Sequence, residues 1–202
     1  MTNGVQLADP TPSARWANLA IKAALFSAFA VAILAPLDHL DGKAMPARAP
    51  IFLAGAVLVP LIARRRQWDP YPHVADALLA LPFLLDTLGN LLGIYDSVES
   101  TDDVLHFVNW IFLVAAFHAF RFRTIGDRRD AVLLGYGFGA LAIVWWEALE
   151  WLASEDGIGG AGGLSLTYGD TVADLMLSST GGLLGSVLAV RLLGPRRPSS
   201  RR

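Results

Sequence analysis

The sequence contains no cysteine. A disulfide framework and a thiolate metal site are therefore both excluded. Charged residues are also scarce, since Asp, Glu, Lys and Arg make up 17% of the chain while 54% is hydrophobic and the mean hydropathy is positive. This balance is far from that of a soluble globular domain and predicts an integral membrane protein.

Several motifs of known enzyme classes are missing as well. The chain has no P-loop, no G-x-S-x-G elbow and no H-E-x-x-H pair. It also lacks the period-2 alternation that a membrane β-barrel requires. Nucleotide binding through a P-loop, zincin chemistry and a barrel fold are thus not supported.

What the sequence does contain is a series of apolar stretches, each close to the length of about 20 residues that a helix needs to cross a bilayer. They lie at residues 18–37, 46–63, 74–94, 104–122, 131–152 and 171–193. We therefore predict an all-α, polytopic membrane helix bundle with six transmembrane helices. The prediction is a single domain over residues 1–202, with flexible tails at 1–14 and 194–202.

Basic residues gather on one side of this predicted bundle. If the helices alternate in direction, one side receives Arg15, Lys22, Arg64, Arg65, Arg66, Arg121, Arg123, Arg128, Arg129 and the tail from Arg191 onward. The other side receives Lys43 and Arg48. The positive-inside rule then predicts that both termini are cytoplasmic. We interpret the arginines as anchors at anionic lipid, with no nucleic acid as a partner.

Polar side chains lie inside the outer halves of four predicted spans. Asp86 lies about 12 Å from the outer end of its span, at a rise of about 1.5 Å per residue, and Asn90 lies one turn nearer that end. Asp103, His106 and Asn109 follow i, i+3, i+6 spacing, which keeps them near one face of a helix. Because a charged side chain near the bilayer centre is disfavoured by about 2.5 to 3.5 kcal/mol, such residues usually face the interior and serve a site or pathway.

The last two predicted spans add further acids. Glu147 and Glu150 are three residues apart, and Asp170 opens the last span. A stripe along that span combines polar and small residues, namely Asp174, Ser178, Gly181 and Gly185. Such small residues allow a neighbouring helix to approach closely, which would hold the polar groups near one another.

Several carboxylates in a low-dielectric pocket cannot all remain ionised without a counter-charge. Protons or a metal cation must supply it, and carboxylates with one imidazole suit a divalent Mg, Mn, Zn or Fe ion better than copper(I). The predicted metal ligands are Asp86, Asp103, His106, Glu147, Glu150, Asp170 and Asp174. The other predicted polar site residues are Asn90, Asp102, Asn109 and Ser178, and the predicted catalytic residues are Glu147, Asp174 and His106.

Structural roles are an alternative for some of these residues. Asp102 and Asp170 precede predicted helices and suit N-caps, and Asp103 would gain from the helix dipole. His106 would also suit a hydrogen-bonded core position, and Glu150 would reach the headgroups by snorkelling.

Three motifs resemble those of known membrane proteins. The segments DDVLHF (102–107), WEALEW (146–151) and DTVADLMLSSTGGLLG (170–185) are similar to the motifs of the YjdF-like family of multi-pass proteins of the bacterial inner membrane. More distantly, they resemble the VanZ-like family, with its D-K-x-x-H-F, E-x-x-Q and D-x-x-x-N-x-x-G-x-x-x-G pattern. The resemblance covers residues 83–186 and implies a location in the bacterial plasma (inner) membrane.

The resemblance assigns motif positions to residues of this chain. It implies that the first motif is held by Asp102 and His106, the second by Glu147 and Glu150, and the third by Asp174, Ser178, Gly181 and Gly185. The chain departs from the VanZ-like pattern at Asp103, Glu150 and Ser178, where Lys, Gln and Asn are usual. The first two departures make the site more acidic and favour the YjdF-like branch. VanZ-like proteins are associated with cell-envelope phenotypes.

Three functions remain open from the sequence. The leading hypothesis is a metal-dependent enzyme acting on an envelope lipid or its headgroup, with Glu147 as general base. The second is a cation- or proton-coupled transporter in which Asp86 and Glu147 bind and release the ion. The third is a non-catalytic assembly protein held together by the polar cluster. The nearly apolar inner halves of the spans favour a one-sided site over a transport path.

Overall fold

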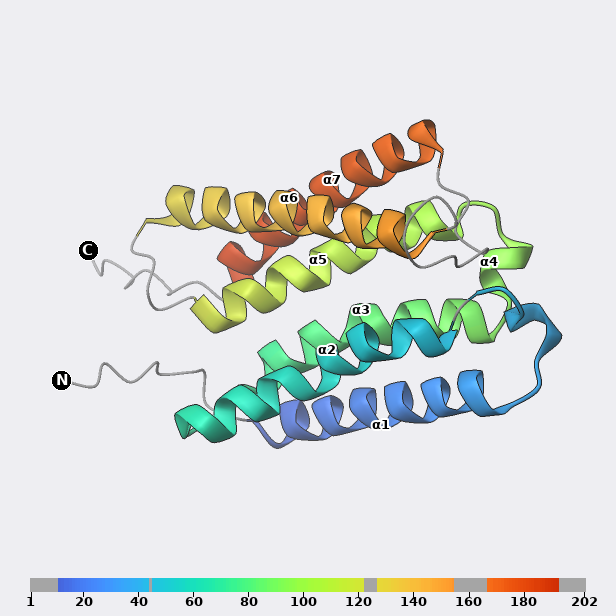
Figure 1. Ribbon diagram of the computed structural model, residues 1–202. Helices are drawn as coiled ribbons and strands as arrows, with labels where there is room; N and C mark the ends of the chain where they lie inside the picture. Colours follow the sequence, from blue (N-terminus) through green and yellow to red (C-terminus); the bar gives the residue numbers. More distant parts are fainter. Residues whose placement is uncertain (1–10, 44, 122–126, 155–166, 193–202) are drawn as a thin grey trace, which may run out of the picture.

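The computed structural model describes residues 11–43, 45–121, 127–154 and 167–192, and these residues form helices and no strand (Figure 1). Six helices are long and apolar enough to cross a membrane. They are α1 (Pro12–Leu34), α2 (Met45–Arg66), α3 (His73–Leu91), α5 (Thr101–Arg121), α6 (Arg128–Ala153) and α7 (Tyr168–Leu192). A short 3-10 helix, η1 (Asp38–Leu40), and a four-residue helix, α4 (Ile94–Ser97), lie between them. The predicted all-α polytopic bundle is confirmed.

Side-chain caps set helix ends that the apolar pattern does not show. α1 begins at Pro12, not at residue 18, because the Thr11 hydroxyl accepts from the amide of Ala14 at 3.3 Å and proline suits a first helical turn. Residues 12–14 are thus helical rather than part of a tail. The rest of both predicted tails, apart from Thr11, lies outside the described residues.

The third span is shorter than predicted. α3 ends at Leu91 instead of reaching residue 94, and Gly93 has a φ of 65°, in the left-handed region that glycine adopts without strain. α4 follows directly after this turn and was not among the predicted helices. The turn brings Tyr95 of α4 back over α3, with its ring against Gly89.

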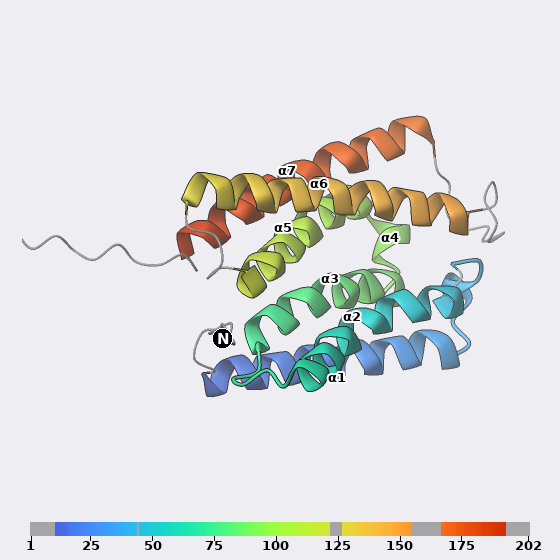
Figure 2. The ribbon, with the colours of Figure 1, turned by 60° about the vertical axis from the view of Figure 1, so that its left-hand side comes forward.

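The six long helices form two groups of three. α1, α2 and α3 lie on one side, and α5, α6 and α7 lie on the other, with α3 packed against α5 between them (Figures 1 and 2). The start of α1, the end of α2 with Arg64–66 and the end of α7 share one end of the bundle, which we call the basic end. Asp38, Asp96 and Asp102 lie at the opposite end, which we call the acidic end. That the basic end is cytoplasmic stays a prediction.

Small residues bring α7 into backbone contact with α5. A Cβ on Gly181 would collide with the backbone oxygen of Phe107, and one on Gly185 would lie 2.7 Å from the backbone oxygen of Ile111. These distances leave no room for a side chain, so the close approach predicted from the stripe is confirmed. The contact fixes the height of α7 relative to α5.

Candidate metal centre

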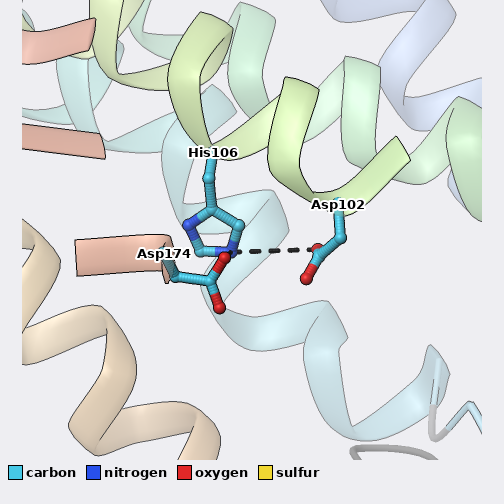
Figure 3. A group of neighbouring side chains, drawn as sticks. All are labelled: Asp102, His106 and Asp174. Atoms are coloured by element: carbon cyan, nitrogen blue, oxygen red, sulfur yellow. Dashed lines mark ion pairs between the residues drawn. The ribbon is translucent and has the colours of Figure 1, made fainter. Parts of the chain in front are cut away.

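Five of the predicted site residues, which α5, α6 and α7 contribute, meet toward the acidic end. Asp102, His106 and Asp174 form one group, and His106, Glu147 and Glu150 form a second. Within each group the candidate ligand atoms lie within 4.8 Å of one another. His106 belongs to both groups and thus lies at the centre, with Asp102 and Asp174 facing its ring in Figure 3.

The ring of His106 is held in a defined orientation. Its Nδ1 lies 3.1 Å from the Ser178 hydroxyl, and that hydroxyl donates to the backbone oxygen of His106 at 3.3 Å. The hydroxyl oxygen is therefore free to accept the Nδ1 proton. The ring also stacks on Trp110, whose Nε1 donates to the backbone oxygen of Gly139. In the tautomer that carries its proton on Nδ1, Nε2 keeps its lone pair, as a metal-binding imidazole must.

Two carboxylates face this nitrogen across a gap. Nε2 lies 3.6 Å from Oδ1 of Asp174 and 3.8 Å from Oδ1 of Asp102 (Figure 3). Both distances exceed the hydrogen-bond range of about 2.7–3.2 Å. They match two ligands of one metal ion, which lie about 3 to 4 Å apart when each is about 2.1 Å from the ion.

Glu147 is the most exceptional of these acids. The residue is 8% exposed, and both of its carboxylate oxygens are buried without a hydrogen-bond partner among the described residues. A buried ionised carboxylate with no partner is disfavoured by several kcal/mol or more, typically about 3–5 kcal/mol in broken ion pairs. The site therefore calls for a cation or a proton beside Glu147.

The nearby basic side chains are engaged with other acids. Lys43 Nζ lies 2.6 Å from Asp96, and an Arg48 guanidinium nitrogen lies 3.8 Å from Asp86. Within the described part of the chain, no Lys or Arg lies at ion-pair distance from the carboxylates of the two groups. The deficit of positive charge predicted from the sequence is thus present in the structure.

Asp86 belongs to a separate polar network. Its carboxylate accepts from Tyr95 at 2.5 Å and from Asn90 at 3.3 Å, besides facing Arg48. Burial and the adjacent Asp86 carboxylate raise the pKa of Tyr95, so its hydroxyl remains a donor. Asp86 and Asn90, predicted as site residues, are therefore not members of the two groups.

Asp102 and Asp103 differ in position as well as in exposure. Asp102 joins the first group, whereas Asp103 is exposed and belongs to neither. On a helix, Asp102 lies about 40° from His106 and Asp103 lies about 60° away on the other side, so the two face different neighbours. α5 begins at Thr101, which places both acids in the first helical turn instead of at the N-cap.

Asp170 and Asn109 are also outside the two groups. Asp170 is half-buried in the first turn of α7, whose preceding residue Thr167 accepts from the Asp170 amide at 3.1 Å. Thr167, not Asp170, is therefore the capping residue. Asn109 is among the residues that line a neighbouring cavity, and its buried Oδ1 has no hydrogen-bond partner in the described residues.

That cavity adjoins the centre, and Asp102, His106 and Glu150 line it. It encloses about 70 Å³. A water needs about 10–15 Å³ of such volume, so the cavity has room for several waters or a small polar group. Phe52 of α2 and Phe83 of α3 form part of its wall, which makes the cavity shared by both helix groups.

A second buried network lies at the basic end, and sequence reasoning missed its pairing. Lys22 of α1 lies 2.5 Å from Asp76 of α3, which also accepts from Asn18 at 2.8 Å and from Tyr71 at 2.5 Å. Burial and the Asp76 carboxylate raise the pKa of Tyr71. The signal for this pair is a Lys inside one apolar span and an Asp near the same end of another, because charges inside spans tend to pair.

Six apolar helices around buried polar groups define an integral membrane protein of the helical-bundle class, and the outer faces of such helices contact lipid. The model of the family described as Predicted membrane protein (DUF2238) matches residues 17–194, so the chain belongs to that family. This match confirms the resemblance to the YjdF-like family. It gives no support to the more distant VanZ-like resemblance. No curated protein and no solved structure shows a significant match to the chain.

Proposed function

We propose that this protein is a metal-dependent enzyme of the bacterial inner membrane that acts on the phosphate-bearing headgroup of an envelope lipid. The observation that carries the proposal is the orientation of His106. Its Nδ1 is occupied by Ser178, and its Nε2 faces two carboxylates at ligand-to-ligand distance. In this proposal Asp102, His106 and Asp174 hold a divalent ion.

The donor set indicates which ions fit. One imidazole and two carboxylates suit Mg, Mn, Zn or Fe, and three protein ligands leave positions open for water and substrate. Asp102 is the most exposed of the three, so the open positions face the mouth of the site at the acidic end. We place this end on the outer side of the membrane.

Glu147 supplies the proton chemistry in this proposal. Its unpartnered carboxylate belongs to the group of Glu147, Glu150 and His106, whose candidate ligand atoms lie within 4.8 Å of one another. A water on an ion bound to His106 would therefore lie close to it. A divalent ion held by Asp102, His106 and Asp174 would polarise a phosphoryl oxygen of the substrate. A water would then form a new P–O bond as the bond from phosphorus to the leaving oxygen breaks. Glu147 accepts the proton of the water and returns it to the leaving oxygen.

The packing toward the basic end supports an enzyme over a carrier. Between Ser178 and Ser186, α7 presents Gly181 and Gly185 directly to the backbone of α5. Val114 of α5, on the same interface, is fully buried. A carrier needs a polar path across the membrane, whereas this interface is closed by backbone contact.

The proposal is tested by elemental analysis and activity of detergent-purified protein. We expect a stoichiometric divalent metal in the wild type, its loss in His106→Ala and Asp174→Asn, and its retention in Glu147→Gln. With vesicles of phosphatidylethanolamine and phosphatidylglycerol, we expect wild-type protein to release headgroup products and Glu147→Gln to release at least about 100-fold less, as for loss of a general base.

Glu99→Gln is the matched control, because Glu99 is an exposed acid at the same end and lies outside the groups. It should retain both metal and activity. Absence of metal from the wild type after repletion contradicts the metal centre. Loss of metal from Glu147→Gln contradicts the role of Glu147 as base.

A further inference from the structure

The cavity beside the centre has an aromatic wall contributed by four helices. Phe52 of α2, Phe83 of α3, Trp110 of α5 and Trp146 of α6 all line it. Their rings are in mutual contact, with centroids 5.5 Å apart for Phe52 and Phe83 and 6.4 Å apart for Trp110 and Trp146. A group in this cavity thus lies against several ring faces or edges.

Three carboxylates are among the polar groups that line the cavity. Asp86, Asp102 and Glu150 line the cavity, and Arg48 balances Asp86. Aromatic rings beside carboxylates make a favourable environment for an organic cation, which is attracted to a ring within about 6 Å of its centroid. The same lining is unfavourable for an anion.

The net charge of the proposed metal centre also favours a ligand that carries a positive group. Asp102, Glu147, Glu150 and Asp174 carry more negative charge when ionised than one divalent ion supplies. A purely anionic headgroup would increase this excess, whereas a zwitterionic headgroup adds no net charge. The positive end of a zwitterionic headgroup would be attracted to the cavity while its phosphate approaches the ion.

Asn109 narrows the choice among organic cations. Its Oδ1 is buried and has no hydrogen-bond partner in the described part of the chain, although Asn109 lines the cavity. A buried acceptor without a donor is disfavoured, and an N–H donor would satisfy it. A primary ammonium carries such donors and a quaternary ammonium carries none.

We propose that this cavity binds a primary ammonium group, and that it receives the ammonium end of a zwitterionic lipid headgroup whose phosphate lies at the metal. The second part rests on the proposed function. Asp102, His106 and Glu150 border both the cavity and the metal centre, so one headgroup of the phosphoethanolamine type spans the two. The cavity thereby selects the substrate, and the metal centre acts on it.

Calorimetric titration of purified, metal-loaded protein tests the proposal with soluble probes. We expect phosphoethanolamine to bind at least tenfold more tightly than phosphocholine, which has no N–H donor, and than glycerol 3-phosphate, which has no cation. Asn109→Leu should abolish the preference over phosphocholine. Trp146→Leu should weaken phosphoethanolamine binding about tenfold through loss of the ring.

Trp145→Leu is the matched control for the ring, because Trp145 is adjacent in sequence but 65% exposed on the outer face of α6. It should bind phosphoethanolamine as the wild type does. Equal affinity for glycerol 3-phosphate and phosphoethanolamine, or equal effects of the two tryptophan variants, overturns the ammonium site.

Two further arms separate the parts of the proposal. Ethanolamine should bind to chelator-treated protein and bind more weakly to its Trp146→Leu variant, which tests the cavity independently of the metal centre. A protein that holds the metal but does not bind ethanolamine overturns this inference and leaves the proposed function intact. In nanodiscs of phosphatidylethanolamine, the lipid headgroup should compete with soluble phosphoethanolamine for the site. Phosphoethanolamine should therefore bind more weakly there than in nanodiscs of phosphatidylglycerol. Equal binding in both overturns the assignment to a lipid.

Discussion

Ser178 is the residue on which the orientation of His106 depends. Its hydroxyl contacts both Nδ1 and the backbone oxygen of His106. We expect Ser178→Ala to lower the affinity for Mn²⁺ about 10- to 100-fold, because partners of a metal-bound histidine fix its ring. Titration of purified protein with Mn²⁺ measures the change.

Thr180→Ala is the control for this prediction. Thr180 is also a hydroxyl residue of α7, but it is exposed and bonds to its own helix at the backbone oxygen of Met176. Its removal should leave Mn²⁺ affinity unchanged. Equal affinity of the Ser178→Ala and wild-type proteins would show that the hydroxyl does not position the ring.

Lys22 and Asp76 have a structural role at the other end of the bundle. Lys22→Met leaves the fully buried Asp76 without its counter-charge. We expect a loss of about 3–5 kcal/mol in the free energy of unfolding, with most of it regained in the double variant Lys22→Met/Asp76→Asn. Unfolding in detergent measures stability, and Mn²⁺ affinity should stay near that of the wild type. An unstable double variant would contradict this account.

At the residue scale, the sequence predicted the kinds of side chain at the site but not their partners. The acids and His106 stand out because they occur in apolar spans. Helix periodicity alone could not show which of Asp102 and Asp103 joins His106 in the candidate site, since both lie within about 60° of His106 around the helix. The direction from which α7 approaches α5 determines that it is Asp102. The pairing of Arg48 with Asp86 depends on the tertiary approach of α2 to α3, which spacing within one helix does not reveal.

At the scale of helices, the contact of α7 with α5 determines whether the site exists. The predicted ligands His106 and Asp174 lie on these two helices, and Gly181 sets their separation. Gly181→Ala places a methyl group against the backbone of Phe107, so the helices must move apart. We expect a loss of about 1–3 kcal/mol in the free energy of unfolding, together with weaker Mn²⁺ binding.

Gly137→Ala on α6 is the matched control. A Cβ at Gly137 would meet nothing within 4 Å, so only helix propensity changes. That change should be neutral or stabilise the protein by about 0.5–1 kcal/mol. Similar stability and metal binding in the Gly181 and Gly137 variants would contradict a role for the close contact.

Helix positions were largely predictable, whereas helix ends were not. The six spans follow from apolar length, which the bilayer imposes. Some ends depend on single polar contacts such as that of Thr11, and on the backbone of Gly93. α4 has four residues, too few for a periodic pattern, so it could not be recognised from the sequence.

For the whole molecule, the absence of cysteine makes the orientation directly measurable. A single cysteine can be introduced at the acidic end as Glu99→Cys, or in the exposed segment after α2 at the basic end as Gln67→Cys. In intact cells, a membrane-impermeant maleimide should label the first and not the second, because the positive-inside rule places the basic end in the cytoplasm. The reverse pattern would contradict the predicted orientation.

The separation of acidic and basic residues to opposite ends of the molecule was predictable, but the packing of its two groups of helices against each other was not. Alternating helices and the arginine pattern are enough to gather the acids at one end. The packing of α3 against α5, and the cavity between Phe52, Phe83 and Trp146, depend on long-range side-chain fit. No repeating pattern in the sequence encodes that fit.

Pulsed EPR of the Mn²⁺-loaded protein tests the metal centre most directly, since it detects nitrogen atoms bound to the ion. We expect modulation from one imidazole nitrogen in the wild type and in Glu147→Gln, and its disappearance in His106→Ala. Bound Mn²⁺ without nitrogen modulation in the wild type would contradict the centre built around His106.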